Sequence, residues 1–211
     1  MASDSLSMGL RIGATYPQIE LGGDPVAVDR IGRAVERLGY DHLVVYDHVV
    51  GAEHADREPP LWGPYDENDP FHDPFVMFGY LAGITDRIEL TTGVVILPQR
   101  QTVLVAQQAA DVDLLSGERL RLGVGSGWNY VEYDALGQDF ATRGPRLDEQ
   151  IEFLRELWSE RVLTYEGRFD RIERGNILPQ PKRRIPIWAG GFSEPAYRRG
   201  ARLCEGFIFA G

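Results

Sequence analysis

The chain has 211 residues, of which 43% are hydrophobic and 26% charged, and its formal net charge is −10. This length and composition allow one large hydrophobic core and give no signature of disorder. The negative charge disfavours nucleic acid as the main partner. No apolar run reaches the roughly 18 residues that a membrane-spanning helix needs. Neither a nucleic-acid-binding protein nor a membrane protein is therefore indicated.

Cys204 is the one cysteine of the chain, which excludes an intramolecular disulfide and favours a reducing cytoplasm. The first seven residues are polar and lack the basic and apolar stretches of a secretory signal. Cys204 follows a helix-like segment with no histidine nearby, which favours a buried structural thiol over a nucleophile. His42, His54 and His72 show no metal-ligand spacing with one another or with Cys204, so we predict no metal site.

Strand-like and helix-like segments alternate in regular order along the chain. Apolar runs predict six core strands, at residues 10–16, 42–46, 88–97, 120–124, 185–189 and 206–210. Capping signals and helical spacing predict five helices, beginning at Pro25 and Pro74 and lying at about 102–115, 146–159 and 193–203. Between the fourth helix and the fifth strand, residues 162–172 predict a β-hairpin that turns at Glu166 and Gly167.

The first two helices carry the same start signal, an aspartate followed by proline. Asp24 precedes Pro25, and Asp73 precedes Pro74; aspartate is a preferred N-cap, and proline suits the first helical position. Gly39 ends the first helix. The residues expected to face the core at helical spacing are Ile31, Ala34, Val35, Leu38, Phe75, Phe78, Ala82, Leu147, Ile151, Leu154 and Trp158.

Repeated strand–helix units imply a parallel sheet with right-handed crossovers, either doubly wound or closed into a (β/α)8 barrel. Both architectures place their active sites at the carboxyl ends of the strands. The long segment 49–72 follows the second strand at that end and is rich in proline, glycine and acidic residues. Long loops in compact domains are usually functional, so this segment predicts a substrate lid.

Asp47 and His48 stand where the second strand ends. Histidine is suited to proton transfer near neutral pH, and a neighbouring carboxylate favours its charged form. The alternative is a capping aspartate beside an ordinary loop histidine. The run from Gly125 to Gly127 is not the dinucleotide fingerprint, because Tyr130 occupies the third glycine position.

Gly190 and Gly191 lie between the fifth strand and a helix that opens at Ser193. A glycine pair before a helix N-terminus offers free backbone N–H groups to an anion such as phosphate. The alternative is a tight turn before a capped helix.

Several short motifs follow one another along the chain. They are residues 46–49, 92–98, 114–117, 123–128, 157–158, 178–181 and 186–191, with Arg100, Arg143, Gly144, Asp148 and Glu149. Together they resemble the bacterial luciferase-like monooxygenase superfamily, most closely its coenzyme F420-dependent oxidoreductase branch. The resemblance runs from about Gly9 to Gly211. It implies a TIM (β/α)8-type barrel with about six βα units present. Residues 1–211 would form a single luciferase-like domain, truncated at the C-terminus.

The resemblance also implies a cofactor, coenzyme F420 or alternatively FMN, at the carboxyl ends of the strands. The cofactor ring would lie against a bulge with a cis peptide bond between Gly93 and Val94. His48 and Asp47 match the catalytic pair, with Asp47 holding the ring edge or the imidazole. The positions that match cofactor-binding positions are Asp47, Thr92, Gly93, Val94, Gly125, Ser126, Gly127, Gly190, Gly191, Phe192 and Ser193.

The expected activity is hydride transfer between F420 and a small organic substrate. An FMN-dependent monooxygenase that uses reduced flavin and O2 is one alternative, and a non-catalytic flavin-binding paralogue is another. The acidic tail of F420 would need arginines at the rim, for which Arg100, Arg143 and Arg184 are candidates. The resemblance further implies a homodimer and a separate flavin or F420 reductase as partners.

Overall fold

The computed structural model describes residues 9–209. The predicted absence of a signal in the first seven residues, the last position of the strand at 206–210 and the end of the resemblance at Gly211 lie outside the described residues. The helices are α1 (Pro25–Arg37), α2 (Pro74–Ile84), α3 (Thr102–Leu115), α4 (Tyr130–Ala135), α5 (Arg143–Ser159) and α6 (Glu194–Leu203), with 3-10 turns η1 (Leu97–Gln99) and η2 (Phe140–Thr142). The strands are β1 (Gly13–Thr15), β2 (His42–Val45), β3 (Glu89–Thr92), β4 (Val95–Ile96), β5 (Leu120–Gly125), β6 (Leu163–Glu166), β7 (Arg171–Gly175), β8 (Ile187–Gly190) and β9 (Gly206–Ile208).

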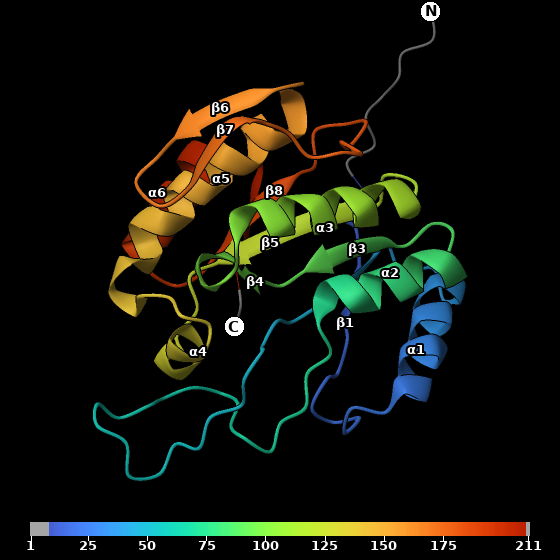
Figure 1. Cartoon of the computed structure of the whole chain (residues 1–211). Helices are drawn as coiled ribbons and strands as arrows, with labels where there is room; N and C mark the ends of the chain where they lie inside the picture. Colours follow the sequence, from blue (N-terminus) through green and yellow to red (C-terminus); the bar gives the residue numbers. More distant parts are fainter. Residues whose placement is uncertain (1–8, 210–211) are drawn as a thin grey trace, which may run out of the picture.

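One parallel sheet forms the core, with its strands in the order β1-β2-β3-β5-β8-β9 and the short β4 beside β5. The sheet curls, and the helices lie along its outer side (Figure 1). A doubly wound sheet would carry helices on both faces. The structure is therefore part of a TIM-type barrel, which confirms the fold prediction. None of the helices within residues 9–209 combines the length and apolar character needed to cross a bilayer.

The two aspartate–proline signals start helices as predicted. The Asp24 carboxylate accepts a hydrogen bond from the Val26 N–H of α1, and Asp73 accepts from the first turn of α2. The α1 prediction is wrong at one position: Leu38 is 70% exposed. The helix ends at Arg37, so Leu38 caps it beyond the last turn that faces the sheet.

Other elements differ from the prediction only locally. The expected strand at 88–97 is interrupted at Gly93 and divided into β3 and β4. α5 begins at Arg143, one turn earlier than predicted, and α4 and η2 were not predicted at all. The hairpin of β6 and β7 is antiparallel, with Glu166 opposite Arg171. The predicted core residues of α2 and α5 are buried: Phe75, Phe78, Ala82, Leu147, Ile151, Leu154 and Trp158.

Arginine–carboxylate pairs join elements at the amino ends of the strands. Arg183 binds the fully buried carboxylate of Asp113 at 2.7 Å. Glu205, just before β9, binds Arg155 at 2.9 Å and Arg184 at 3.0 Å, and it also accepts the Ile187 N–H. These pairs connect α3, α5 and the starts of β8 and β9, so their role is to hold the barrel wall together.

Candidate active site

The interruption of β3 lies at the carboxyl end of the sheet. The peptide bond between Gly93 and Val94 is cis, as the resemblance implies. β4 then resumes pairing with β5, with Val95 opposite Val124. A side chain at Gly93 would collide with Val44 of β2, so glycine is required for the chain to pass this close. The result is a bulge on which Val94 is half-buried.

Two predicted cofactor glycines pack against Val94 itself. A Cβ atom added at Gly125 would lie 2.5 Å from a Val94 methyl group, and one at Gly190 would lie 2.7 Å from the other. The ends of β5 and β8 therefore need glycine to accommodate the bulge, whether or not a ligand is bound. Thr92 is fully buried and donates its hydroxyl to the Gly123 carbonyl at 2.7 Å, so this side chain faces the sheet.

The carboxylate of Asp47 also has partners within the protein. Its side chain is buried, and it accepts a hydrogen bond from the Ile96 N–H at 2.9 Å. It also binds Arg100 at 2.7 Å, and Arg100 in turn contacts Asp73 at 3.1 Å. Burial alone would lower the pKa of Arg100, but the two carboxylates raise it above its usual value. Asp47 thus joins the end of β2 to β4, and it does not bind the imidazole of His48.

The imidazole partner is Glu132, a residue that the sequence analysis did not identify. Its Oε1 atom lies 3.2 Å from His48 Nδ1 and accepts the N–H groups of Val49 at 2.7 Å and Val50 at 3.1 Å. The Glu132 side chain is 2% exposed and the His48 side chain 10%. Because a carboxylate faces Nδ1, the proton of the neutral ring belongs there and Nε2 is left as the acceptor.

Glu132 lies on α4, a helix of six residues. Asn129 starts this helix: its side-chain oxygen accepts from the Val131 and Glu132 N–H groups, and its amide donates to the Val50 carbonyl at 3.3 Å. An asparagine followed by glutamate three positions later is a recognisable helix start. That signal could have revealed the helix, but not the contact of Glu132 with His48.

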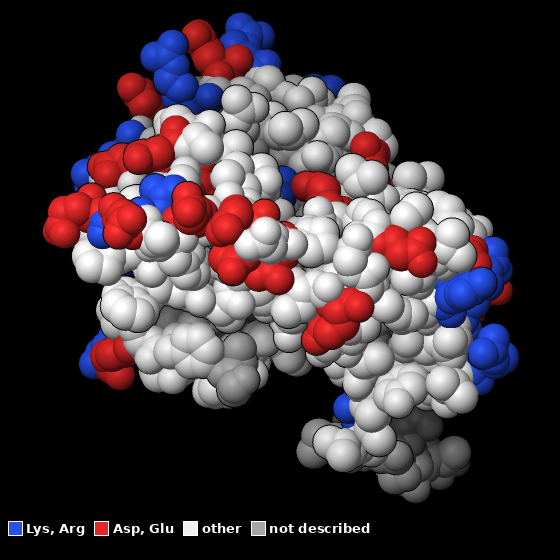
Figure 2. Space-filling model, turned by 90° about the horizontal axis from the view of Figure 1, so that it is seen from below, with Lys and Arg blue, Asp and Glu red and all other residues white. Residues whose placement is uncertain are grey.

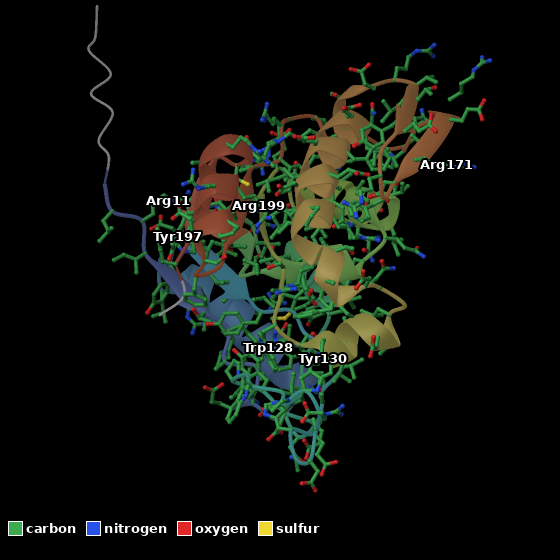
Figure 3. The ribbon with its side chains drawn as sticks, turned by 90° about the vertical axis from the view of Figure 1, so that its left-hand side faces the viewer. Arg11, Trp128, Tyr130, Arg171, Tyr197 and Arg199 are labelled. Carbon is green, nitrogen blue, oxygen red and sulfur yellow. The ribbon has the colours of Figure 1, made fainter. Side chains whose placement is uncertain are left out.

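Three aromatic rings enclose His48. The ring centroids of Tyr65, Phe71 and Trp128 lie 5.0, 4.9 and 5.6 Å from that of the imidazole. Tyr65 and Phe71 belong to the 49–72 segment, which the Tyr130 hydroxyl holds by a 2.7 Å bond to the Pro59 carbonyl. Trp128 and Tyr130 lie at the end of the molecule where this segment extends (Figure 3). The segment covers the site, as a lid would.

A cavity of about 240 Å³ opens next to this cluster, beyond the ends of β1 and β2. It is lined by residues 15–20 together with Tyr46 and Tyr65. Tyr65 therefore belongs both to the cavity wall and to the aromatic cluster around His48. A small substrate in the cavity would lie beside the ring that encloses the histidine.

The predicted phosphate site follows β8. Gly191 has a φ of 143°, which a side chain rarely adopts, and a Cβ there would lie 3.0 Å from that of Ala196. Ser193 is the N-cap of α6, yet its hydroxyl makes no capping hydrogen bond. Within residues 9–209 the N–H groups of Phe192 and Ser193 have no acceptor. Unused donors at a helix N-terminus are suited to bind an anion.

The three candidate rim arginines differ in position. Arg100 is neutralised by Asp47 and Asp73. Arg184 precedes β8 and binds Glu205, so the expectation that it lies at the cofactor rim is wrong. Arg143 lies after β5 at the carboxyl end, with its guanidinium 3.8 Å from the centre of the Phe140 ring, and it has no carboxylate partner in the described part of the chain.

Other residues considered in the sequence analysis contribute no side chain to the His48 cluster or to the predicted phosphate site. Ser126 contributes its carbonyl, which accepts the Tyr133 hydroxyl at 2.7 Å, and Gly127 has a φ of 63°. Cys204 is half-buried, and burial raises the pKa of its thiol to about 11, which suits a structural thiol. Residues 9–209 contain no cluster of three or more metal-ligating side chains.

The fold and this arrangement define a TIM-type barrel with a histidine-centred site at the carboxyl ends of its strands. The luciferase-like monooxygenase family model matches residues 11–211, and the chain belongs to this family, whose members are oxidoreductases and monooxygenases.

Individual relatives support this assignment. An uncharacterized protein of Mycobacterium tuberculosis is 32% identical over 185 residues, which cover 86% of this chain and 64% of that protein. The F420-dependent glucose-6-phosphate dehydrogenase of Microbacterium testaceum is 27% identical over 96% of this chain and 57% of its own. The resemblance to the F420-dependent branch is thus confirmed.

A solved structure shows the same fold. The type II Baeyer–Villiger monooxygenase of Pseudomonas putida, in complex with FMN, has a TM-score of 0.74 at 18% identity, covering 96% of this chain and 58% of that one. The chain spans about half to two thirds of the length of the curated relatives it matches.

Proposed function

We propose that the chain transfers a hydride between coenzyme F420 and a small organic substrate, with His48 exchanging a proton with that substrate. The observation that carries this proposal is the state of His48. Its Nδ1 atom is held by Glu132, its ring is enclosed by aromatic side chains, and its Nε2 atom has no partner in residues 9–209. A buried histidine with one nitrogen oriented and the other open is suited to general acid–base catalysis.

The residues at the carboxyl end fit an F420-like cofactor. The half-buried Val94 on the bulge offers an apolar surface for a flat ring. The free N–H groups of Phe192 and Ser193 suit a phosphate, and the guanidinium of Arg143, which has no carboxylate partner among residues 9–209, suits further negative charge. The deazaflavin ring of F420 would supply the two-electron hydride chemistry. The F420-dependent relative of Microbacterium testaceum supports this choice of cofactor.

Different residues of the protein would then have different roles in the reaction. In the oxidative direction the Nε2 atom of His48 accepts the proton of the substrate hydroxyl as the hydride leaves the carbon. The carboxylate of Glu132 stabilises the resulting imidazolium through Nδ1. Asp47 would act by fixing the position of β4, because its oxygens are occupied by Ile96 and Arg100. The aromatic cover of the 49–72 segment keeps water from the reacting atoms.

The alternatives differ in the cofactor and in turnover. The FMN complex of the similarly folded monooxygenase supports an FMN-dependent oxygenase. A non-catalytic flavin-binding paralogue would bind a ring without converting a substrate. Fluorescence titration of the chain with F420 and with FMN tests the choice: we expect micromolar F420 binding. Binding of FMN alone would assign the protein to the flavin monooxygenases, and binding without turnover to the paralogue.

We further propose that residues 1–211 act as one domain in the cytoplasm, as a homodimer supplied by a separate F420 or flavin reductase. Equilibrium sedimentation tests the dimer. Dependence of turnover on an added reductase tests the supply of reduced cofactor.

A further inference from the structure

The cavity beyond β1 and β2 is built from fixed backbone and aromatic rings. Gln18 is 4% exposed and fully engaged: its amide donates to the Tyr46 carbonyl at 2.6 Å, and its oxygen accepts the His72 N–H at 3.1 Å. It thereby connects the ends of β1 and β2 to the end of the 49–72 segment. The cavity wall is therefore held in shape from three segments of the chain, which a preformed small-molecule site requires.

The uncharged polar side-chain groups that remain for a ligand are hydroxyls, those of three tyrosines and that of Thr15 at the end of β1. Tyr16, Tyr46 and Tyr65 line the cavity, and their hydroxyls make no hydrogen bond to another residue within 9–209. Burial raises the pKa of both Tyr16 and Tyr65, with nearby carboxylates acting in the same direction. Tyr16 and Tyr65 therefore stay neutral at physiological pH. A phenol hydroxyl can donate or accept a hydrogen bond.

Among residues 9–209, no cationic side chain lines the cavity. Its charged lining residue is Glu20, which is exposed at the rim, and Asp24 and Asp69 act on the lining tyrosines from nearby. Across this face of the molecule, acidic side chains occupy the middle and basic ones lie mostly toward the margins (Figure 2). An anion placed here would lose water without gaining a positive partner, which is costly.

We propose that this cavity binds the substrate and that the substrate is an uncharged, hydroxyl- or carbonyl-bearing organic molecule, not a phosphorylated sugar or another anion. This inference rests on the proposed function for the reaction that follows binding. The phenols hydrogen-bond the substrate oxygen, and Tyr65, which contacts both cavity and His48, orients it toward the imidazole. The rim carboxylate of Glu20 repels anionic analogues.

Binding of matched probes, measured by calorimetry without turnover, tests the substrate class. The probes are cyclohexanol, cyclohexanecarboxylate, cyclohexylammonium and glucose 6-phosphate, each with the chain alone and with F420 present. We expect cyclohexanol to bind at least 10-fold more tightly than either anion. Equal or tighter binding of an anion or of the ammonium, or no binding of cyclohexanol at millimolar concentration, would overturn the inference.

Three variants locate the binding. Glu20→Arg should strengthen carboxylate binding by about 10-fold, because it replaces a repulsive charge with an attractive one. Tyr65→Phe keeps the ring and should weaken cyclohexanol binding by about 3- to 10-fold through loss of one hydrogen bond. Glu173→Gln, an exposed carboxylate on β7, is the control and should change neither. If probe affinity is the same in the Glu20 and Tyr65 variants as in the wild type, the ligand binds elsewhere and the assignment is overturned.

The experiments distinguish failure of the cavity assignment from failure of the proposed reaction. If cyclohexanol binds with this dependence on Glu20 and Tyr65 but F420 does not bind, the cavity assignment stands and the proposed reaction fails. If F420 binds and His48 is needed for turnover but anions are preferred, the reaction stands and the substrate class fails.

Discussion

The amino and carboxyl ends of the strands both carry polar groups, yet the groups at the two ends differ in whether the protein supplies their partners. At the amino end, Asp113 and Glu205 are bound by arginines from neighbouring elements. At the carboxyl end, His48 Nε2 and the N–H groups of Phe192 and Ser193 have no acceptor or donor among the described residues. In a TIM-type barrel the first end serves stability and the second serves ligands. The contrast predicts that substitutions at the two ends change different measured quantities.

The largest effect is expected from His48→Ala. Loss of the general acid–base group should lower turnover by about 10²- to 10⁴-fold while leaving the Kd for cofactor nearly unchanged. The matched control is His42→Ala at the amino end of β2, where the imidazole lies against Gly13. That variant should lower the melting temperature and leave the turnover of the folded protein intact. Equal turnover losses in both variants would contradict the division between the two ends.

Glu132→Gln should have the next largest effect. Glutamine keeps the size of the side chain but removes the charge that faces His48 Nδ1. Hydrogen bonds to charged groups are worth about 1.5–3 kcal/mol, so we expect kcat to fall by roughly 10- to 100-fold with KM nearly constant. A parallel rise in KM, or a loss restricted to folding, would show that Glu132 only supports the 49–72 segment.

Ser193→Ala tests the phosphate site without disturbing α6. Replacing an N-cap serine usually costs about 1 kcal/mol, but the Ser193 hydroxyl caps nothing, so the melting temperature should not change. Cofactor affinity should fall by about 3- to 10-fold through loss of one hydrogen bond. A substitution at Gly191 is a poorer test because its φ of 143° strains any side chain. A drop in melting temperature without a change in Kd would assign Ser193 a purely structural role.

Glu205→Gln should have the smallest effect, confined to stability and dependent on pH. Burial alone would raise the pKa of Glu205, but hydrogen bonds from Arg155 and Ile187 N–H outweigh it and lower the pKa. A lowered folded-state pKa stabilises the protein above the unfolded value of about 4.3, and this stabilisation is lost as the pH falls through the folded value.

The Glu205 side chain is 36% exposed, so solvent weakens its ion pairs. We expect Glu205→Gln to lower the free energy of unfolding by about 0.5–1 kcal/mol at pH 7. Urea denaturation at pH 7 and at pH 3 measures it. A difference between wild type and variant that persists undiminished at pH 3 would contradict an origin in charge, and any effect on turnover would contradict its location at the structural end.

The sequence predicted the order of elements well because the signals are local. Asp24 and Asp73 bind the first N–H groups of their own helices, and the buried faces of α2 and α5 follow helical spacing. Local signals also explain the errors. Leu38 fits the helical period but lies one residue past the end of α1, and α4 is too short for its period to be recognised.

What the amino-acid sequence determined by itself is the alternation of strands and helices, and therefore a parallel sheet with its site at the carboxyl ends. Only the tertiary structure decided which groups meet there. Glu132 and His48 are 84 residues apart, and Asp47 and Arg100 are 53 apart. Side-chain pairing at such separations depends on how the strands stack and on where each loop returns. Spacing along the chain carries no record of either, so Asp47 could be expected to hold the imidazole that Glu132 holds.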